Sequence, residues 1–362
     1  MPLDSAITIL TAADIVHMLS ERHAELKDIV IKVYTEFGRG TIAVPPAAFL
    51  RPKANRPERF IALPAYLAYG DAVAGVKWIG SFPRNTDDGL ERASAVIVLN
   101  SPADGRPLAL LEGATISAIR TAMSALVLVE TIRKDRNVSR IGVIGCGRIA
   151  FAVCRLLATE YGCLKGPLVY DADSKRAQRF AQVLKELEIA ADVVSLPSQG
   201  EILRDCQVVV FATTATEPHL ALPDPNVAGQ VILHLSLRDI EPESMWDAIN
   251  IVDSQEHAFR EGTSLGLARR LARGNNMEVV EISDLLAKER RIDVERGTRI
   301  IFSPFGLGAL DVALAHYVWR RSAILGVGVQ VPGFLGTSWN DAKAHGEESA
   351  SIKQQCGVQE SK

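Results

Sequence analysis

The sequence predicts an α/β protein, in which a doubly wound parallel sheet of the Rossmann type lies beside a second α/β domain. Three observations support this fold class. Strand-like apolar stretches alternate with helical stretches from residue 140 onward. A glycine-rich turn follows the first of these strands. At 362 residues, the chain is also too long for one typical core, which favours two domains.

The N-terminal third is expected to be a mixed α/β region. Its elements, in chain order, are a helix at 11–37 with Thr11 as N-cap, a strand at 76–79, and a hairpin of strands at 95–99 and 108–110. A longer helix over 115–133, capped by Thr115, then leads into the glycine-rich strand.

The following alternation predicts the parallel sheet. Its expected strands are 140–145, 167–171, 192–196, 208–213, 231–237 and 249–253. Helices are expected at 148–160, 174–188, 283–290 and 308–325, and one further strand at 299–303.

These elements suggest a division into domains. We expect residues 126–298 to form the nucleotide-binding domain, and residues 1–125 and 299–335 to fold together as a second domain that binds substrate and dimerises. Residues 336–362 are polar and poor in aliphatic side chains, so we expect them to be a disordered tail.

Residues 140–150 predict where the dinucleotide binds. Gly145 makes the tight turn, and Gly147 lets the backbone approach a pyrophosphate because it has no Cβ. Ala150 allows the next helix to pack closely on the strand, and the N-terminus of that helix offers free N–H groups. The next strand ends in Asp171, where an acidic residue meets the ribose hydroxyls of a dinucleotide.

The same acidic residue indicates which cofactor binds. A carboxylate at Asp171 repels a 2′-phosphate, which favours NAD over NADP. Lys175 and Arg176 follow closely, so NADP remains the alternative.

The composition excludes several classes of protein. With 48% hydrophobic and 23% charged residues the chain resembles an ordinary globular protein, and its net charge of −3 gives no basic field for nucleic acid. The N-terminus lacks a signal-peptide pattern, and no uninterrupted apolar run reaches the ~18 residues that span a membrane. The five cysteines have no CxxC spacing, so we expect reduced thiols in the cytoplasm and no metal site.

Four polar residues stand out in otherwise apolar or loop-like surroundings. Lys77 interrupts an apolar strand, where it needs an anion as partner, and Arg120 lies near the start of the 115–133 helix. Arg51 lies in a loop-like basic stretch. Asp239 follows the strand at 231–237, at the end where doubly wound sheets bind ligands. Together they suggest a site for an anionic substrate.

Each of these residues has a structural alternative. Lys77 is equally consistent with an edge strand facing water, and Arg120 with an ion pair to Glu112 or Glu91. Arg238 and Asp239 fit a surface turn. His234, within an apolar strand, is more typical of a hydrogen-bonded core histidine than of a catalytic one.

Over about residues 5–335 the sequence resembles the ornithine cyclodeaminase/mu-crystallin family. The motifs that carry the resemblance are Leu63–Tyr66 followed by Lys77, Gly105 with Leu108–Gly113, Ile119–Ala122, Gly145–Gly147, Thr214-Ala215, Val252–Ser254, and Phe305-Gly306 before Asp311. Three further segments, residues 77–83, 92–95 and 234–240, are similar to the branch that oxidises N-(2-amino-2-carboxyethyl)-L-glutamate in the synthesis of 2,3-diaminopropionate, a precursor of siderophores and antibiotics.

The resemblance implies roles for particular residues. Arg51, Lys77 and Arg120 would hold the substrate carboxylates, with Lys77 also counted beside Asp239 as catalytic. The cofactor contacts it implies, added to those of the glycine turn, are Arg148, Ile149, Asp171, Thr214 and Ser236. Two departures speak against ornithine as substrate, because Glu243 replaces a lysine of the cyclodeaminases and Pro304 replaces a serine.

The expected activity is therefore NAD-dependent oxidative cleavage of N-(2-amino-2-carboxyethyl)-L-glutamate to 2,3-diaminopropionate and 2-oxoglutarate, with release of NADH. Three alternatives remain open: an ornithine cyclodeaminase, an alanine dehydrogenase or ketimine reductase, and a non-catalytic crystallin-type NAD(P)-binding protein. The family also implies a homodimer.

Overall fold

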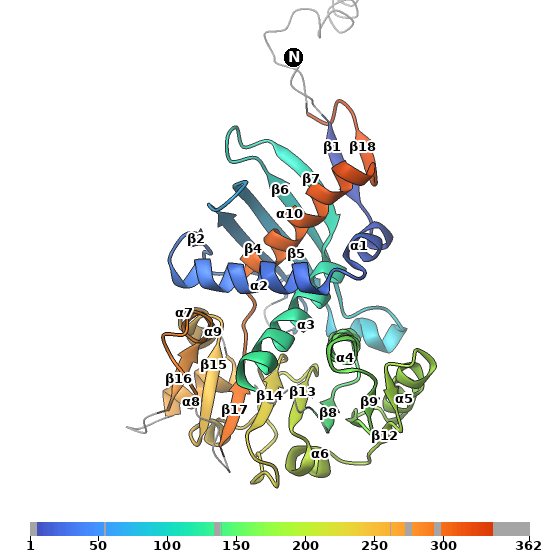
Figure 1. Cartoon of the computed structure of the whole chain (residues 1–362), viewed down its shortest axis with the longest axis vertical. Helices are drawn as coiled ribbons and strands as arrows, with labels where there is room; N and C mark the ends of the chain where they lie inside the picture. Colours follow the sequence, from blue (N-terminus) through green and yellow to red (C-terminus); the bar gives the residue numbers. More distant parts are fainter. Residues whose placement is uncertain are drawn as a thin grey trace, which may run out of the picture.

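The structure, a computed structural model, describes residues 6–53, 56–133, 138, 140–260, 262–271, 277–292 and 298–335. Figure 1 shows two lobes, each built on its own sheet, with helix α3 (Gly113–Ile132) running between them. The predicted tail at 336–362 lies outside the described residues.

The lower lobe contains the doubly wound sheet. All its neighbouring strands pair in parallel. Their order is β12 (Val194–Ser195), β10 (Leu168–Tyr170), β8 (Ile141–Ile144), β13 (Val208–Phe211), β14 (Gln230–His234), β17 (Arg299–Phe302), β15 (Ala248–Val252) and β16 (Val279–Glu281). Its central strands β8, β13 and β14 are buried along their whole length, as expected of a sheet covered on both faces. The predicted fold class is confirmed.

Helices and short elements surround this sheet. They are α4 (Arg148–Tyr161), α5 (Ser174–Glu186), α6 (Gly200–Asp205), α7 (Gln255–Arg260), α8 (Ser264–Leu271), α9 (Ile282–Leu286), the 3₁₀ helix η2 (Pro242–Met245), and the small pair β9 (Leu164–Lys165) and β11 (Ala190–Ala191).

The upper lobe is built on a mainly antiparallel sheet. Its order is β18 (Val329–Val331), β1 (Ile7–Leu10), β7 (Pro107–Glu112), β6 (Ala93–Asn100), β5 (Val73–Ser81), β4 (Arg59–Leu67) and β2 (Ile42–Ala43), with β3 (Ala48–Leu50) also on β4. Its helices are α1 (Ala12–Leu19), α2 (His23–Gly38), α10 (Gly308–Leu325) and the 3₁₀ helix η1 (Pro83–Asp88). The pairing of β1 with β18 brings both ends of the described chain into one lobe.

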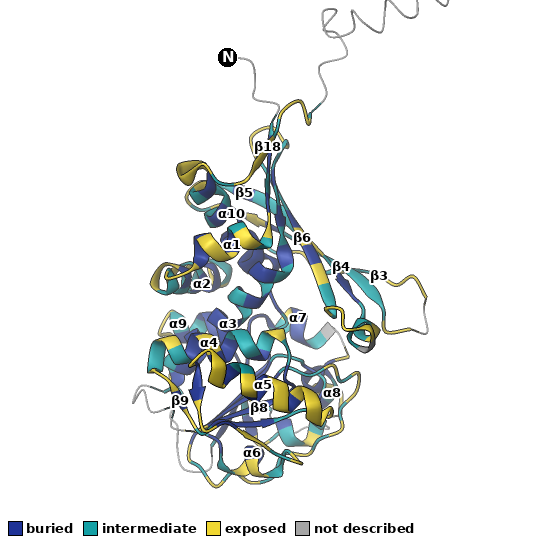
Figure 2. Ribbon diagram, turned by 90° about the vertical axis from the view of Figure 1, so that its right-hand side faces the viewer, coloured by how far each residue is buried: buried dark blue, intermediate teal, exposed yellow. Residues whose placement is uncertain are grey.

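The upper sheet is covered on one face. In Figure 2 the long helices of this lobe lie on one side of the sheet. Helix α10 packs on β4 and β5, and α3 packs on β6. The other face carries Tyr66, Trp78 and Val96, each 39% exposed. Trp78 and Val96 are cross-strand partners, and Phe60 stacks on Trp78 at 5.6 Å, so these apolar side chains form a continuous surface.

The long strand β4 is absent from the predicted elements because it contains Pro64. The structure shows why a proline fits there. Residues 60–62 of β4 pair with β3, and Tyr66 and Leu67 pair with β2. Pro64 lies between these two segments, where β4 has β5 on one side and no strand partner on the other. A missing N–H therefore costs no ladder hydrogen bond on that side.

The predicted helix at 11–37 is wrong as a single element. It is broken into α1 and α2 by a turn in which Glu21 has φ of 60°, a conformation that a continuous helix excludes. The cap at Thr11 is confirmed, because its side chain accepts from the backbone N–H of Asp14 while Asp14 accepts from the Thr11 N–H.

Thr115 is not the N-cap of α3, contrary to the prediction. The helix begins at Gly113, and the Glu112 carboxylate accepts the backbone N–H groups of Ala114 at 2.7 Å and Thr115 at 2.9 Å. Glu112 therefore caps the helix, a role for which threonine is the more common residue. The Thr115 hydroxyl is left free to bind another side chain.

The predicted boundary at residue 298 is also wrong. Strand β17 lies between β14 and β15 in the doubly wound sheet, not in the upper lobe. All four of its residues are buried, which a central position in a covered sheet requires. The chain returns to the upper lobe only at α10, and α3 runs without a break through the predicted boundary at 125/126.

In the described part of the chain, α3 alone has the length and apolar composition of a membrane-spanning helix. Yet 72% of its apolar window is buried inside the protein, against α2, α4 and α10 among others. It therefore has the burial of a core helix.

Candidate active site

A cavity of about 660 Å³ is lined by residues of both lobes. The upper lobe contributes residues of β5, of the segment before β6, and of the first turns of α3. The lower lobe contributes the carboxyl ends of β8, β10 and β13, which are neighbours in the sheet. Ligands of doubly wound sheets bind at this edge. Six of the seven predicted cofactor residues line the cavity: Gly145, Gly147, Arg148, Ile149, Asp171 and Thr214.

The two glycines of the turn have different requirements. Gly145 has φ of +92°, and a Cβ there would lie 2.6 Å from the Ala212 carbonyl oxygen, so only glycine fits. A Cβ on Gly147 would meet no atom within 4 Å. Helix α4 begins directly after Gly147 and has no side-chain cap on its first turn. The lack of protein atoms around a Cβ at Gly147 and the uncapped N–H groups fit a pyrophosphate.

Asp171 is held firmly at the rim of the cavity. Its Oδ2 accepts the Cys146 N–H at 2.8 Å, and its Oδ1 accepts the Asp173 N–H at 3.0 Å. Arg176 also lines the cavity, and its Nε donates to the Cys146 carbonyl at 3.3 Å. The carboxylate and the arginine therefore stand side by side where the ribose of a dinucleotide is expected.

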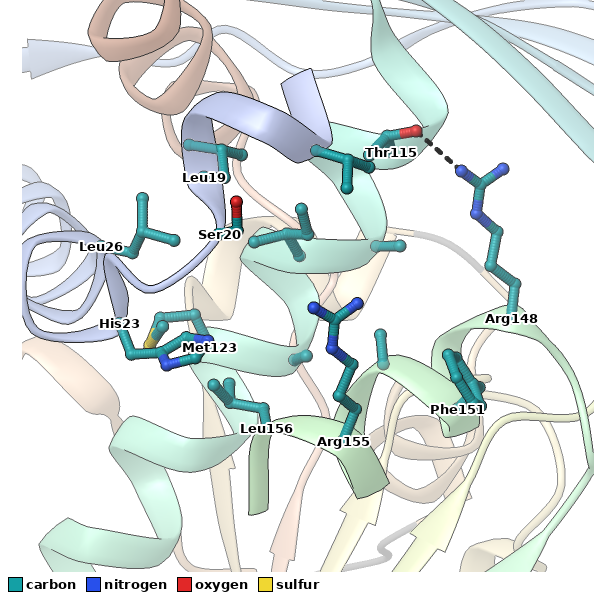
Figure 3. A pocket seen from close by; sticks show the side chains of 15 residues that line it. Leu19, Ser20, His23, Leu26, Thr115, Met123, Arg148, Phe151, Arg155 and Leu156 are labelled. Atoms are coloured by element: carbon teal, nitrogen blue, oxygen red, sulfur yellow. Dashed lines mark hydrogen bonds between the residues drawn. The ribbon is translucent and has the colours of Figure 1, made fainter. Parts of the chain in front are cut away.

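Arg148 connects the two lobes. Its Nη2 donates to the Thr115 hydroxyl at 2.8 Å, the group that the glutamate cap of α3 leaves free. Figure 3 shows this side chain reaching from α4 to α3, at the edge of a second, smaller cavity of about 230 Å³ lined by α1 to α4. Arg148 lines both cavities, so the start of α4 is fixed to the upper lobe at the mouth of the larger one.

The structure brings Lys77 and Arg120 together on one carboxylate. Lys77 Nζ lies 2.7 Å from Asp311 Oδ2, and Arg120 Nε lies 3.2 Å from Asp311 Oδ1. The Ser117 hydroxyl accepts from Lys77 at 3.1 Å and from Arg120 at 3.4 Å. Lys77 is only 2% exposed, which excludes the edge-strand alternative, and its neighbour Arg120 pairs with neither Glu112 nor Glu91.

This cluster has more positive than negative groups. Burial lowers the pKa of Lys77 to about 8, although Asp311 works in the opposite direction. Burial also opposes ionisation of Asp311, but Arg120 and Lys77 together hold its pKa below the usual value. Asp311 is therefore ionised and is shared by two cations. Another anion, such as a substrate carboxylate, is favoured beside them.

Asp239 lies in a second cluster, on the lower lobe. It is fully buried and accepts hydrogen bonds from the hydroxyls of Thr213 and Ser236. His234 Nε2 lies 3.2 Å from Asp239 Oδ2, and His234 Nδ1 lies 3.2 Å from the Ser303 hydroxyl. Burial works against ionisation of Asp239, yet the hydrogen bonds from His234, Ser236 and Thr213 lower its pKa. Asp239 is thus a buried carboxylate, not part of a surface turn.

Each cluster reaches the same cavity through one hydroxyl-bearing residue, since Lys77, Arg120 and Asp239 are not among the residues that line it. Ser117, which binds Lys77 and Arg120, lines the cavity from above. Thr213, which binds Asp239, lines it from below. A molecule in the cavity therefore has two cations behind Ser117 on one side and one carboxylate behind Thr213 on the other. Ser236, like Asp239 to which it donates, does not line the cavity.

Arg51 is not brought to this site. It is exposed at the end of β3, and its guanidinium lies 5.5 Å from the Phe49 ring centre. Among the described residues, no hydrogen bond or ion pair joins it to Lys77, Arg120 or Asp239. Glu243, one of the departures from the family pattern, is exposed in η2.

Sequence reasoning passed over Asp311 and Thr213 as functional residues. Asp311 had a usable signal, because it interrupts the apolar helix at 308–325 just as Lys77 interrupts a strand. Thr213 directly follows strand β13, where its neighbour Thr214 was the predicted residue. His234 is a fully buried, hydrogen-bonded histidine as expected, and its partner is Asp239.

The fold and the cavity define a dinucleotide-binding protein whose second lobe holds two buried cations on one carboxylate. Residues 7–323 match the ornithine cyclodeaminase/mu-crystallin family, and the chain belongs to this family. The predicted membership is confirmed.

Three known proteins illustrate the similarity. The N-((2S)-2-amino-2-carboxyethyl)-L-glutamate dehydrogenase of Staphylococcus aureus is 24% identical over 279 residues, which are 75% of this chain and 81% of the relative. The Δ(1)-pyrroline-2-carboxylate reductase of Thermococcus litoralis, solved with NADH and L-proline, superposes with a TM-score of 0.81 at 24% identity, covering 90% of this chain and 100% of that one. An archaeal alanine dehydrogenase, solved as a dimer with NAD, gives 0.77 at 24% identity, covering 90% and 99%.

Proposed function

We propose that the chain is an NAD-dependent amino-acid dehydrogenase, and that its substrate is N-(2-amino-2-carboxyethyl)-L-glutamate. The observation that carries the proposal is the pair of buried cations, Lys77 and Arg120, which share Asp311 on one side of the cavity while Asp239 lies on the other. The choice of substrate is supported by the Staphylococcus aureus relative.

The lower wall of the cavity fits NAD. Gly147 and the N–H groups at the start of α4 would receive the pyrophosphate, and Asp171 the ribose hydroxyls. When bound, NAD⁺ supplies the acceptor for a hydride. The relatives solved with NAD or NADH support this assignment.

The chain's own residues position the substrate and move protons. Lys77 and Arg120 hold the carboxylate next to the carbon that is oxidised, which fixes the orientation of its C–H bond. Loss of hydride from that carbon leaves an iminium ion. Asp239 then accepts a proton from the water that adds to the iminium carbon. It returns that proton to the nitrogen as the C–N bond breaks, and the hydroxyl proton passes to solvent as the carbonyl group of 2-oxoglutarate forms. The leaving amine is 2,3-diaminopropionate.

The experiment incubates the protein with NAD⁺ and one amine at a time, follows NADH by absorbance, and identifies products by mass spectrometry. NADH formed together with 2,3-diaminopropionate and 2-oxoglutarate supports the proposal. NADH formed only from alanine or another small amino acid would assign a different dehydrogenase. Proline formed from ornithine without net NADH would assign a cyclodeaminase, and tight NAD binding without turnover would assign a non-catalytic protein.

We further propose a homodimer formed through the open face of the upper sheet. Tyr66, Trp78 and Val96 make this face apolar over neighbouring strands, and such surfaces mark contacts with other proteins. The archaeal alanine dehydrogenase described as a dimer supports the assignment. The Trp78→Glu variant should elute from size exclusion with half the mass of the parent, and an unchanged mass would contradict this interface.

We propose the cytoplasm as the location. The four described cysteines, Cys146, Cys154, Cys163 and Cys206, are all free thiols, which is typical of a reducing compartment.

A further inference from the structure

One cation that lines the cavity, Arg92, has no counterion among the described residues. Arg92 lies just before β6 and lines the main cavity. Its Nε is buried, and no hydrogen-bond partner reaches it within the described chain. Lys77 and Arg120 share Asp311, whereas no ion pair to Arg92 is formed by the described carboxylates. The residue as a whole is half-buried. Buried polar atoms almost always have a partner, so the Nε of Arg92 needs one that the described chain does not provide.

The position of Arg92 places it at the substrate end of the cavity. It lies within electrostatic reach of Arg238, the neighbour of Asp239 in sequence. Burial, together with the positive charge of Arg238, lowers the pKa of Arg92. Asp171 and Arg176, where the ribose is expected, belong to the carboxyl end of β10 and the start of α5 instead. Arg92 therefore belongs, with Ser117, to the upper-lobe side of the cavity and not to the side where the adenosine is expected.

The charges around Arg92 favour an anion from outside. Glu91 also lines the cavity, but it is exposed and forms no ion pair with the Arg92 guanidinium. The only nearby group that acts on Arg92 electrostatically is another cation. A carboxylate is the natural partner, because the planar guanidinium presents a fork of N–H donors that matches its two oxygens.

We propose that Arg92 binds a second carboxylate of the substrate, so that the site selects diacids over monocarboxylates. The inference rests on the proposed function, since it takes the cavity to be the place where an amino acid is oxidised. Lys77 and Arg120 hold the carboxylate next to the reacting carbon, and Arg92 holds a distal one. N-(2-amino-2-carboxyethyl)-L-glutamate carries such additional carboxylates, whereas alanine and proline do not.

The preference for diacids follows because a substrate with a single carboxylate leaves Arg92 unpaired. A monocarboxylate satisfies Lys77 and Arg120 but leaves the buried Nε of Arg92 without a partner. A site built around a buried polar group rejects the analogue that cannot pair with it more strongly than an apolar pocket rejects a smaller ligand. The distance between the Lys77–Arg120 pair and Arg92 thereby determines which class of substrate binds, while Asp239 has the same role for every substrate.

The test uses two ligands that differ by one distal carboxylate. 2-Oxoglutarate and pyruvate are titrated calorimetrically into the NADH-loaded protein, for the parent chain and for Arg92→Gln. We expect Arg92→Gln to weaken 2-oxoglutarate binding by about 10- to 100-fold, the range for a hydrogen bond to a charged group, and to change pyruvate binding less than about threefold. Arg92→Lys, which keeps the charge but not the fork, should fall between the two.

Arg84→Gln is the matched control, because Arg84 lies in the same segment and pairs only at the surface, 3.8 Å from Glu58. It should leave both affinities unchanged. Equal losses for both ligands, no loss for either, or weaker binding of NADH itself would each overturn the role of Arg92. These binding results do not depend on turnover, so a protein that fails to cleave the proposed substrate would refute the proposed function without refuting this inference.

Discussion

The two walls of the cavity hold their polar groups in different ways. On the upper wall, Lys77 and Arg120 are held by an ion pair to Asp311, a residue 234 positions from Lys77 in the sequence. On the lower wall, Asp239 is held by hydrogen bonds from Thr213, Ser236 and His234, two of which lie within five residues of it. The upper wall therefore stabilises cations, and the lower wall stabilises one anion.

The difference indicates that the upper wall binds the substrate and the lower wall transfers protons. An excess of cations over carboxylates suits a wall that binds an anion and does not itself react. A carboxylate with donors on both oxygens suits a wall that exchanges protons, because the same donors stabilise its ionised form. Substitutions on the upper wall should therefore change mainly the free energy of unfolding. Substitutions on the lower wall should change mainly the rate of the chemical step.

The largest expected effect is on the lower wall. Asp239→Asn removes the charge but keeps the shape, so turnover should fall at least about 10³-fold, the scale of general acid–base catalysis. The affinity for NAD should stay within about twofold, because it depends on the glycine turn. NADH formation and NAD titration measure the two quantities. Asp247→Asn, at an exposed position, serves as control, and loss of NAD binding in Asp239→Asn would show a structural role instead.

A large effect of another kind is expected on the upper wall. Asp311→Asn leaves Lys77 and Arg120 buried beside each other without a carboxylate, and should lower the free energy of unfolding by about 3–5 kcal/mol in urea titrations. Adding Lys77→Met to this variant removes one cation and should recover part of the loss. Asp71→Asn breaks only the exposed pair with Arg320 and should change stability by less than about 1 kcal/mol. Equal effects of the buried and exposed changes would contradict the comparison.

The sequence could indicate the lower wall better than the upper one, for a physical reason. Gly145, Gly147 and Asp171 follow strands of a parallel sheet, so the position in the fold follows from local order along the chain. Lys77 is detectable because an apolar strand surrounds it. The pairing of Lys77 with Asp311 is not predictable from either segment alone, because it depends on how α10 returns to the upper sheet.

The same limit explains the two main errors. Strand β17 follows a long connection, and nothing local in residues 299–303 says which of the two sheets it joins. Arg51 was assigned by resemblance alone, and the structure leaves it exposed, with no hydrogen bond or ion pair to the buried cations among the described residues.

A smaller effect separates stability from cofactor binding within the lower wall. Gly145→Ala forces a Cβ against the Ala212 carbonyl at a positive φ, and should lower the free energy of unfolding by about 1–3 kcal/mol. Gly147→Ala meets no protein atom, so stability should be unchanged, while NAD affinity should fall about tenfold because the new methyl group occupies cofactor space. Urea titration and NAD titration test both variants. If Gly147→Ala bound NAD with normal affinity, the pyrophosphate would not lie at this turn.

The smallest effect comes from titration of the upper wall. Burial brings the pKa of Lys77 to about 8, below its value in the unfolded chain, so the lysine loses its charge as pH rises through 8. Binding of 2-oxoglutarate to the NADH-loaded protein should therefore weaken about tenfold between pH 7 and pH 9. The contribution of Lys77 to stability has the opposite sign. It is complete above the unfolded pKa near 10.5 and is lost as pH falls through about 8, because the folded state resists protonation.

The Lys77→Met variant makes this test specific. It keeps the apolar stem and leaves Asp311 paired with Arg120 alone, so 2-oxoglutarate should bind more weakly at every pH and without the loss above pH 8. Titrations of both proteins from pH 6 to pH 10 measure the difference. If the variant retained the same pH dependence as the parent, the titrating group would lie elsewhere, and the upper wall would not owe its affinity for anions to the charge on Lys77.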